Sequence, residues 1–105
     1  MNKFKGAMKM KFEDFKSEIE KIDNNLSVEK YGEDQIVMIG LTLQDRKAGD
    51  IEVLLDGVVS VLRISTDDDG NRFLQIKIRV AIDSFDTIFK ILNLAKEYME
   101  ALDNE

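Results

Sequence analysis

The spacing between apolar residues changes twice along this chain, and those changes limit the folds that it can form. Near the start, apolar side chains recur every three or four residues and share one face of an α-helix; they are Met8, Phe12, Phe15, Ile19 and Ile22. From Leu26 the spacing becomes two, which is typical of a β-strand with one buried face. Beyond residue 83 the helical spacing returns. The pattern therefore predicts a helix, a set of strands and a second helix.

The first helix is expected over residues 8–23. Asp23, Asn24 and Asn25 should end it, because their short side chains compete for backbone hydrogen bonds. Residues 1–16 hold five lysines against two acidic residues, so the N-terminal end is basic. We expect residues 1–7 to fray from the domain.

The next part of the chain predicts a first hairpin. Residues 26–31 and 35–43 both alternate in polarity, and Gly32, Glu33 and Asp34 between them are turn-forming residues. We expect these two strands to pair antiparallel. Residues 44–50 are polar and charged, and are expected to form a loop.

Residues 51–58 allow two interpretations. The pair Asp56-Gly57 favours a two-residue hairpin turn, because both of its central residues tolerate positive φ. The alternative is a short amphipathic helix whose apolar face includes Ile51, Leu54 and Val58. The many Val and Ile residues favour strands.

A second hairpin is expected between residues 58–66 and 72–82, with Thr66 opposite Arg72. Residues 67–71 form its turn, and one of its faces is almost wholly apolar. A register shift of one residue would bury three cations, which supports the register chosen. The outer face of this hairpin, away from the helices, then carries Val59, Val61, Arg63, Gln75, Lys77 and Arg79.

The last helix is expected over residues 84–102, with Asp83 or Ser84 as its N-cap. Its predicted core stripe consists of Phe85, Ile88, Phe89, Leu92, Ala95, Met99 and Leu102. A second apolar stripe is expected to be surplus to the core and available to a partner helix or a second copy; it consists of Ile91, Leu94 and Tyr98.

Together these elements predict a single α+β domain over residues 1–105, since a chain of this length supports one core. The expected order is an N-terminal helix, an antiparallel meander of four to five strands, and a C-terminal helix. Both helices should pack on one face of the sheet.

The composition excludes much of enzyme chemistry. The chain has no His and no Cys, so thiolate nucleophiles, His-based dyads and the usual zinc sites are excluded. Residues 67–70 begin like a calcium loop, but Ile78 stands where the bidentate Glu would be required. Other carboxylates lie at predicted turns or strand ends, where we expect them to be exposed; they are Asp34, Asp45, Asp50, Glu52 and Asp56. We expect no metal, no cofactor and no catalytic activity.

The charge balance directs attention to protein partners. The chain has 21 acidic and 15 basic residues, a formal net charge of −6, which opposes broad attraction to nucleic acid or anionic lipid. No apolar run approaches the length of a membrane span, and no signal peptide is recognised, so a cytoplasmic location without membrane contact is expected.

The predicted function is that of a small acidic, non-enzymatic binding protein. It would act stoichiometrically on a basic or nucleic-acid-binding protein, as an inhibitor or adaptor of the kind that phages and mobile elements encode. The predicted acidic contact residues are Asp67, Asp68, Asp69, Glu33 and Asp34.

Two alternatives use other surfaces. The first is a self-assembling homodimer, formed through the last helix or through the outer sheet face around Met38, Val59 and Val61. The second is a nucleic-acid accessory protein that uses cations of the outer sheet face, Arg63, Lys77 and Arg79.

Overall fold

The computed structural model describes residues 10–32, 35–39, 42–55, 59–77 and 82–104, with the backbone alone at 35–39, 42–45 and 59. Helix α1 (Phe12–Ile22) comes first and helix α2 (Phe85–Asp103) last, and a short 3-10 turn (Ile82–Ser84) leads into α2. The strands between them are β1 (Leu26–Lys30), β2 (Gln35–Ile39), β3 (Thr42–Arg46), β4 (Ile51–Leu55), β5 (Val59–Thr66) and β6 (Arg72–Ile76). The predicted α+β order is confirmed.

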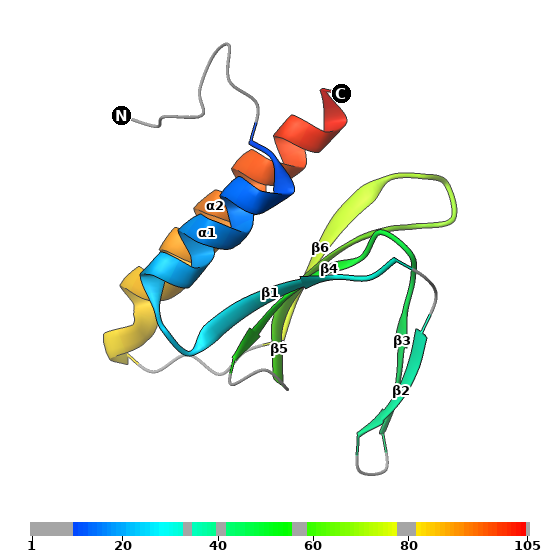
Figure 1. Cartoon of the computed structure of the whole chain (residues 1–105), viewed down its shortest axis with the longest axis horizontal. Coiled ribbons are helices and arrows are strands. Elements are labelled where there is room, and N and C mark those ends of the chain that lie inside the picture. The colour runs from blue at the N-terminus through cyan, green and yellow to red at the C-terminus, as the bar shows by residue number, and fades with distance from the viewer. Residues whose placement is uncertain (1–9, 33–34, 40–41, 56–58, 78–81, 105) are drawn as a thin grey trace.

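The strands form two antiparallel sheets. The larger has the order β1-β4-β5-β6, and β2 and β3 pair as a separate two-stranded hairpin. Both helices cover one face of the larger sheet, and the β2–β3 hairpin is directed away from the helices (Figure 1). The helices therefore leave the opposite face of the sheet, the outer face, to other groups.

The first predicted hairpin is wrong in its pairing. Lys30 of β1 pairs with Ile51 of β4, and Gln35 of β2 pairs with Arg46 of β3. Four residues lie between these two pairs in each arm, 31–34 in one and 47–50 in the other, so the register is the same on both sides. The strands β1–β2 and β3–β4 are therefore the two arms of one long hairpin, which bends between the two pairs. Gly32 lies in one arm and Gly49, with a φ of +91°, in the other. They mark this bend and not a reversal of the chain.

The loop predicted over residues 44–50 is also wrong in part, because β3 continues to Arg46. Polar residues suggested a loop, since a strand of a larger sheet usually alternates with apolar residues. Among the described strands, β3 pairs with β2 alone. A two-stranded ribbon of this kind does not need an apolar face.

The second hairpin is confirmed in its pairing, but β6 ends at Ile76, and Ile82, expected in the strand, lies in the 3-10 turn. Residues 51–55 form a strand and not a helix, and Thr66 pairs with Arg72 as predicted. The register shifts between Val53 and Leu54, because Val53 pairs with Leu62 whereas Leu54 pairs with Ser60. The predicted Asp56-Gly57 turn and the expected pairs of residues 78 and 80 lie outside the described residues, whereas the Lys77 amide still donates to the Val61 carbonyl at 3.1 Å.

The core lies between the two helices and the sheet. Phe15 of α1 stacks on Tyr98 of α2 with ring centroids 4.8 Å apart, and both side chains are buried. Helix α1 begins at Phe12 and not at residue 8; the Asp14 carboxylate accepts a hydrogen bond from the Lys11 amide at 3.0 Å and caps the start. Within the described ranges, neither helix is long and apolar enough to cross a membrane.

The predicted faces of α2 are reversed in part. Ile91 and Tyr98, expected to be surplus, are buried in the core together with Ala95. Phe85 and Phe89, expected in the core, are 47% and 57% exposed. Helix α2 packs against both α1 and the sheet. Its buried face is therefore the face that points toward these two elements.

Candidate functional site

A buried ionic cluster lies on the outer face of the sheet, beside the bend of the long hairpin. Its centre is Glu52 of β4, which is fully buried although its neighbours Ile51 and Val53 belong to the core on the other face. Glu52 Oε1 accepts a hydrogen bond from Arg63 Nε at 2.9 Å, and Oε2 accepts one from Arg46 Nε at 3.0 Å. Together with Tyr31 these residues are called the Glu52 cluster.

Tyr31 connects this cluster to the end of β1. Its hydroxyl lies 3.2 Å from Glu52 Oε2 and 3.2 Å from Glu29 Oε2, and the Arg46 guanidinium lies 5.2 Å from the centre of its ring. Burial, together with the negative charge of Glu52, raises the pKa of Tyr31 to about 12. The phenol therefore keeps its proton at neutral pH and acts as a hydrogen-bond donor.

Arg46 is buried at the end of β3. Burial alone would lower the pKa of its guanidinium, but the hydrogen bond and charge of Glu52 outweigh that effect and raise the pKa above its ordinary value. The Glu52 cluster thus joins β3, β4, β5 and the residue after β1 through charge-assisted hydrogen bonds. This arrangement holds the bent hairpin against the sheet and leaves no carboxylate oxygen of Glu52 without a donor.

A second buried carboxylate strengthens the same bend. Asp50 Oδ1 accepts a hydrogen bond from the Ser65 hydroxyl at 2.5 Å, and Oδ2 accepts one from the Lys47 amide at 3.0 Å. Asp50 and Glu52 were both expected to be exposed, and both are buried. The expectation failed because a strand-end position does not reveal which distant side chains cover it.

The predicted acidic turn lies between β5 and β6. Asp67 Oδ1 accepts hydrogen bonds from the amides of Asp69 and Asn71, each at 2.9 Å, so this carboxylate shapes the turn itself. The Asp68 side chain is fully exposed and lies 3.8 Å from Lys47 Nζ. Asp69 is also exposed. Glu33 and Asp34, predicted to act with them, lie outside the described residues.

The residues predicted for the outer face lie in different places in the structure. Val61 was expected on that face but is buried in the core cluster, because the register shift beside Leu54 makes it the extra residue of β5. Arg63 lies on the outer face but is held by Glu52, and Lys77 is exposed. The side chains of Met38 and Val59, and all of Arg79, lie outside the described part of the chain.

The apolar residues that the structure leaves exposed were not predicted from the sequence. Five large apolar side chains are exposed among the described residues; they are Leu55, Ile76, Ile82, Phe85 and Phe89. For Phe85 and Phe89 the signal is the excess of apolar residues in the last helix, whose exposed face was predicted wrongly. Phe85 and Phe89 contact each other, with ring centroids 6.2 Å apart.

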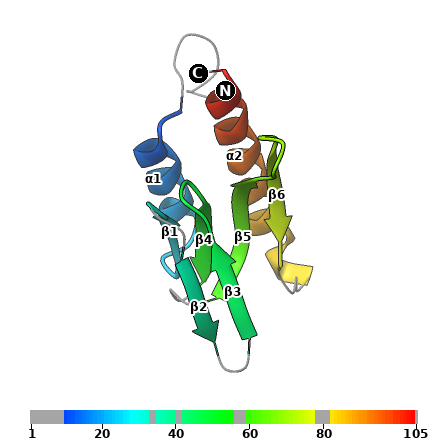
Figure 2. The same cartoon turned by 90° about the vertical axis from the view of Figure 1, so that its right-hand side faces the viewer.

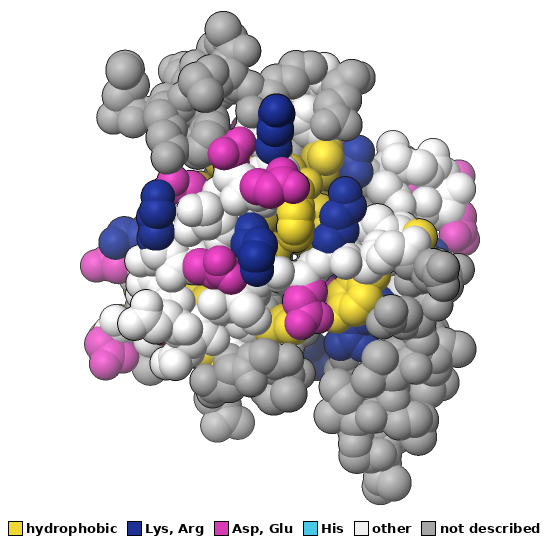
Figure 3. All heavy atoms as spheres, in the orientation of Figure 1, with side chains coloured by type: hydrophobic (Ala, Val, Ile, Leu, Met, Phe, Trp, Pro, Cys, Tyr) yellow, Lys and Arg dark blue, Asp and Glu magenta, His cyan; other side chains and the backbone are white. Residues whose placement is uncertain are grey.

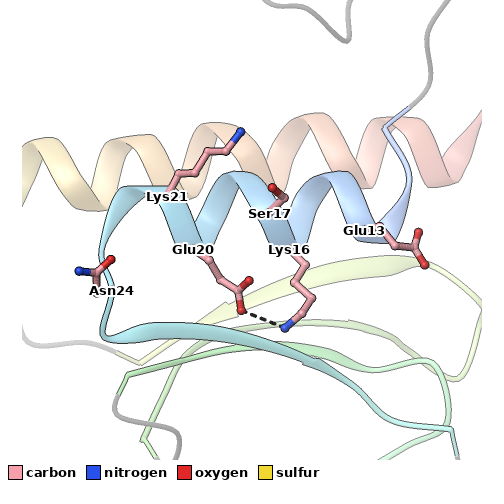
Figure 4. A pocket seen from close by; sticks show the side chains of 6 residues that line it. All are labelled: Glu13, Lys16, Ser17, Glu20, Lys21 and Asn24. Carbon is pink, nitrogen blue, oxygen red and sulfur yellow. Dashed lines mark hydrogen bonds and ion pairs between the residues drawn. The ribbon is translucent and has the colours of Figure 1, made fainter.

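The surface of α1 carries charges of both signs and an open groove. Figure 3 shows acidic and basic side chains interspersed over this side of the molecule. Figure 4 shows the groove, lined by Glu13, Lys16, Ser17, Glu20, Lys21 and Asn24. Lys16 Nζ contacts Glu20 at 2.9 Å and the Val28 carbonyl of β1 at 3.3 Å. No group of carboxylates suited to a metal ion occurs within the described ranges.

Comparison with protein family models, with curated proteins and with solved structures finds no match.

Proposed function

We propose that this chain is a small acidic, non-enzymatic protein-binding module that acts stoichiometrically on a basic or nucleic-acid-binding protein, as an inhibitor or adaptor. The observation that carries the proposal is the β5–β6 turn, which presents Asp68 and Asp69 to solvent from a fixed backbone. The net charge of −6 favours encounter with a basic partner at long range.

The turn is preorganised by contacts of its own. Besides the two bonds to the Asp67 carboxylate, the Gly70 amide donates to the Asp67 carbonyl at 3.0 Å, and Gly70 has a φ of +86° that suits glycine. The Asp67 amide also donates to the Asn71 carbonyl at 2.9 Å. Carboxylates on a turn that is already ordered lose little conformational entropy when a partner binds.

The chemistry of the described residues supports binding over catalysis. The buried titratable groups are already engaged by one another, as in the Glu52 cluster and the Asp50–Ser65 pair. The raised pKa of Tyr31 makes its phenol a weaker acid and not an activated base. These groups are better suited to holding strands together than to proton transfer.

The nucleic-acid alternative has weaker support. It relied on outer-face cations, and Arg63 instead forms a 2.9 Å ion pair with the buried Glu52. A guanidinium held in this way has less capacity to neutralise a phosphate. Lys77 is the remaining member of that set within the described residues.

The test is a pull-down from lysate of the source cells, with nuclease present, followed by mass spectrometry. The wild-type chain is compared with Asp68→Lys/Asp69→Lys. The matched control is Asp83→Lys/Asp86→Lys, which makes the same change in net charge at exposed positions in the 3-10 turn and in the first turn of α2. We expect one basic protein to be captured in stoichiometric amount by the wild type and the control, and at least tenfold less by the turn variant.

Two results would overturn the proposal. Equal capture by all three chains would show that the acidic turn does not form the contact. The lack of any stoichiometric protein, in wild type as in variants, would remove the binding function itself.

A further inference from the structure

The two edges of the four-stranded sheet are protected to different degrees. At the β1 edge, the Lys16 side chain of α1 contacts the Val28 carbonyl at 3.3 Å. The same side chain is paired with Glu20, as Figure 4 shows. Charged side chains placed over an edge strand discourage further pairing. At the other edge, β6 pairs with β5. Arg72 at the start of β6 pairs with Asp103 of α2 at 3.2 Å, and beyond it no strand within the described ranges pairs with the open side of β6. As far as the described residues extend, this edge can accept a further strand.

The backbone of β6 offers a symmetric set of hydrogen-bonding groups on that open side. The Lys77 amide donates to the Val61 carbonyl at 3.1 Å, so Lys77, Gln75 and Phe73 direct their backbone groups to β5. The residues between them alternate and direct theirs outward; they are Arg72, Leu74 and Ile76. These three residues are centred on Leu74. In an antiparallel second copy of β6, each outward amide of one strand would therefore lie opposite an outward carbonyl of the other.

The charges beside β6 favour pairing of this strand with itself. Acidic residues 67–69 precede the strand and Lys77 follows it. When two copies pair antiparallel about Leu74, Lys77 of one copy lies opposite Asn71 of the other, two residues from the exposed Asp69. Opposite charges then meet at both ends of the pairing, and a two-fold axis creates each contact twice.

Exposed apolar side chains occur at the end of β6 and at the start of α2. Ile76 at the end of β6 is 49% exposed, and Phe85 and Phe89 at the start of α2 are similarly exposed. The side of α2 that faces α1 carries Leu94, which with Ile22 lines the groove between the helices. Phe89 lies five residues from Leu94, about 140° around the helix, and so on the opposite flank. Figure 2 shows β6 and the start of α2 along one side of the molecule.

We propose that two copies of this chain form a homodimer through their β6 edges, antiparallel about Leu74, which joins two four-stranded sheets into one. The α2 helices of the two copies then lie on the same face and run antiparallel, so each covers Phe85 and Phe89 at the start of the other. This inference does not rest on the proposed binding of a basic protein.

The first experiment measures mass by sedimentation equilibrium from 1 μM to 1 mM protein. The wild type should shift from 12.0 kDa toward twice that mass as concentration rises. Ile76→Pro removes one outward amide, which an edge strand tolerates without loss of its own sheet. We expect its dimer dissociation constant to rise at least tenfold. Ile76→Val keeps the amide and is the control.

A charge exchange tests the register without altering the backbone. Lys77→Glu alone and Asp69→Lys alone should each weaken the dimer about tenfold, because each places like charges together at both ends of the pairing. The double variant Lys77→Glu/Asp69→Lys should restore wild-type affinity. All of these chains should keep the wild-type circular dichroism spectrum.

Three results would overturn the inference. They are a wild type that stays at 12.0 kDa up to 1 mM, a dimer that Ile76→Pro leaves intact, and a double charge variant that is no tighter than either single one. Because Ile76→Pro leaves the acidic turn unchanged, its effect on mass and the effect of the turn variant on capture distinguish the two proposals.

Discussion

Glu52 lies in the middle of an apolar run of sequence. Its carboxylate can stay buried because three side chains donate hydrogen bonds to it. Arg46, Arg63 and Tyr31 all lie within 3.2 Å of its two oxygens. A buried carboxylate without such donors would be strongly unfavourable. The donors come from three separate parts of the chain, so the cluster forms only when those parts come together.

The first prediction concerns the loss of this carboxylate. Glu52→Ala leaves two guanidinium groups without their shared acceptor, one of them deeply buried, and should lower the free energy of unfolding by about 3 to 5 kcal/mol. Urea unfolding monitored by circular dichroism measures the change. Glu29→Ala removes the exposed acceptor of Tyr31 and should cost less than about 1 kcal/mol. Equal losses in both variants would contradict the assigned role of Glu52.

The second prediction concerns the pH dependence given by Tyr31. Its pKa is about 12 in the folded chain, above the ordinary value of roughly 10 expected on unfolding. The folded state therefore binds the proton more tightly, and this contribution to stability is complete below pH 10 and is lost as the pH rises to 12. Because Tyr31 is only partly buried, we expect a loss of no more than about 1 kcal/mol.

Tyr31→Phe isolates this effect from the lysines that titrate in the same range. The difference in unfolding free energy between wild type and variant should be constant up to pH 9.5 and should shrink towards pH 12. An ultraviolet absorbance titration should show the ionisation near pH 12 in the wild type and its loss in the variant. A difference that does not change with pH would show that the folded state does not shift this phenol.

At the scale of the elements, α2 has more apolar residues than its buried face can hold, and packing determines which of them are buried. Ala95 is fully buried beside the Phe15–Tyr98 stack, and its small side chain allows close approach of the neighbouring elements. The face that includes it is directed at both α1 and the sheet. Phe85 and Phe89 have larger side chains, yet they lie away from that contact and stay exposed.

The third prediction compares the two faces of α2. Ile91→Ala removes a side chain that is 3% exposed and should cost about 2 to 5 kcal/mol, because it leaves a cavity in the core. Phe89→Ala removes a larger side chain that is mostly in water and should cost less than about 1 kcal/mol. Urea unfolding of dilute protein measures both. A larger loss for Phe89→Ala would instead show that the buried face is the one predicted from the sequence.

At the scale of the whole molecule, the long bent hairpin contributes to both sheets. Its β1–β4 end supplies two strands to the sheet, and its β2–β3 end stands apart from the helices (Figures 1 and 2). The Glu52 cluster and the Asp50–Ser65 pair lie where the two ends meet. The bend thus separates a helix-covered core from a two-stranded ribbon.

Features that depend on neighbouring residues could be predicted from the amino-acid order alone. The apolar spacing predicted both helices and the strands β1, β4, β5 and β6, whereas β2 and β3 were expected as one strand followed by a loop. The turn at residues 67–71, with the one apolar face of the second hairpin, predicted the pairing of Thr66 with Arg72. Local backbone preferences and side-chain periodicity act over a few residues, so they are visible in the order of the amino acids.

Only the tertiary structure decided the features that depend on segments far apart in the chain. They are the pairing of β1 with β4, the register shift that buries Val61, the burial of Glu52 and the buried face of α2. In each case a local pattern allowed two or more arrangements of similar quality. The choice was made by which distant side chains could fill the core and satisfy buried charges, and that information is not contained in any short stretch of sequence.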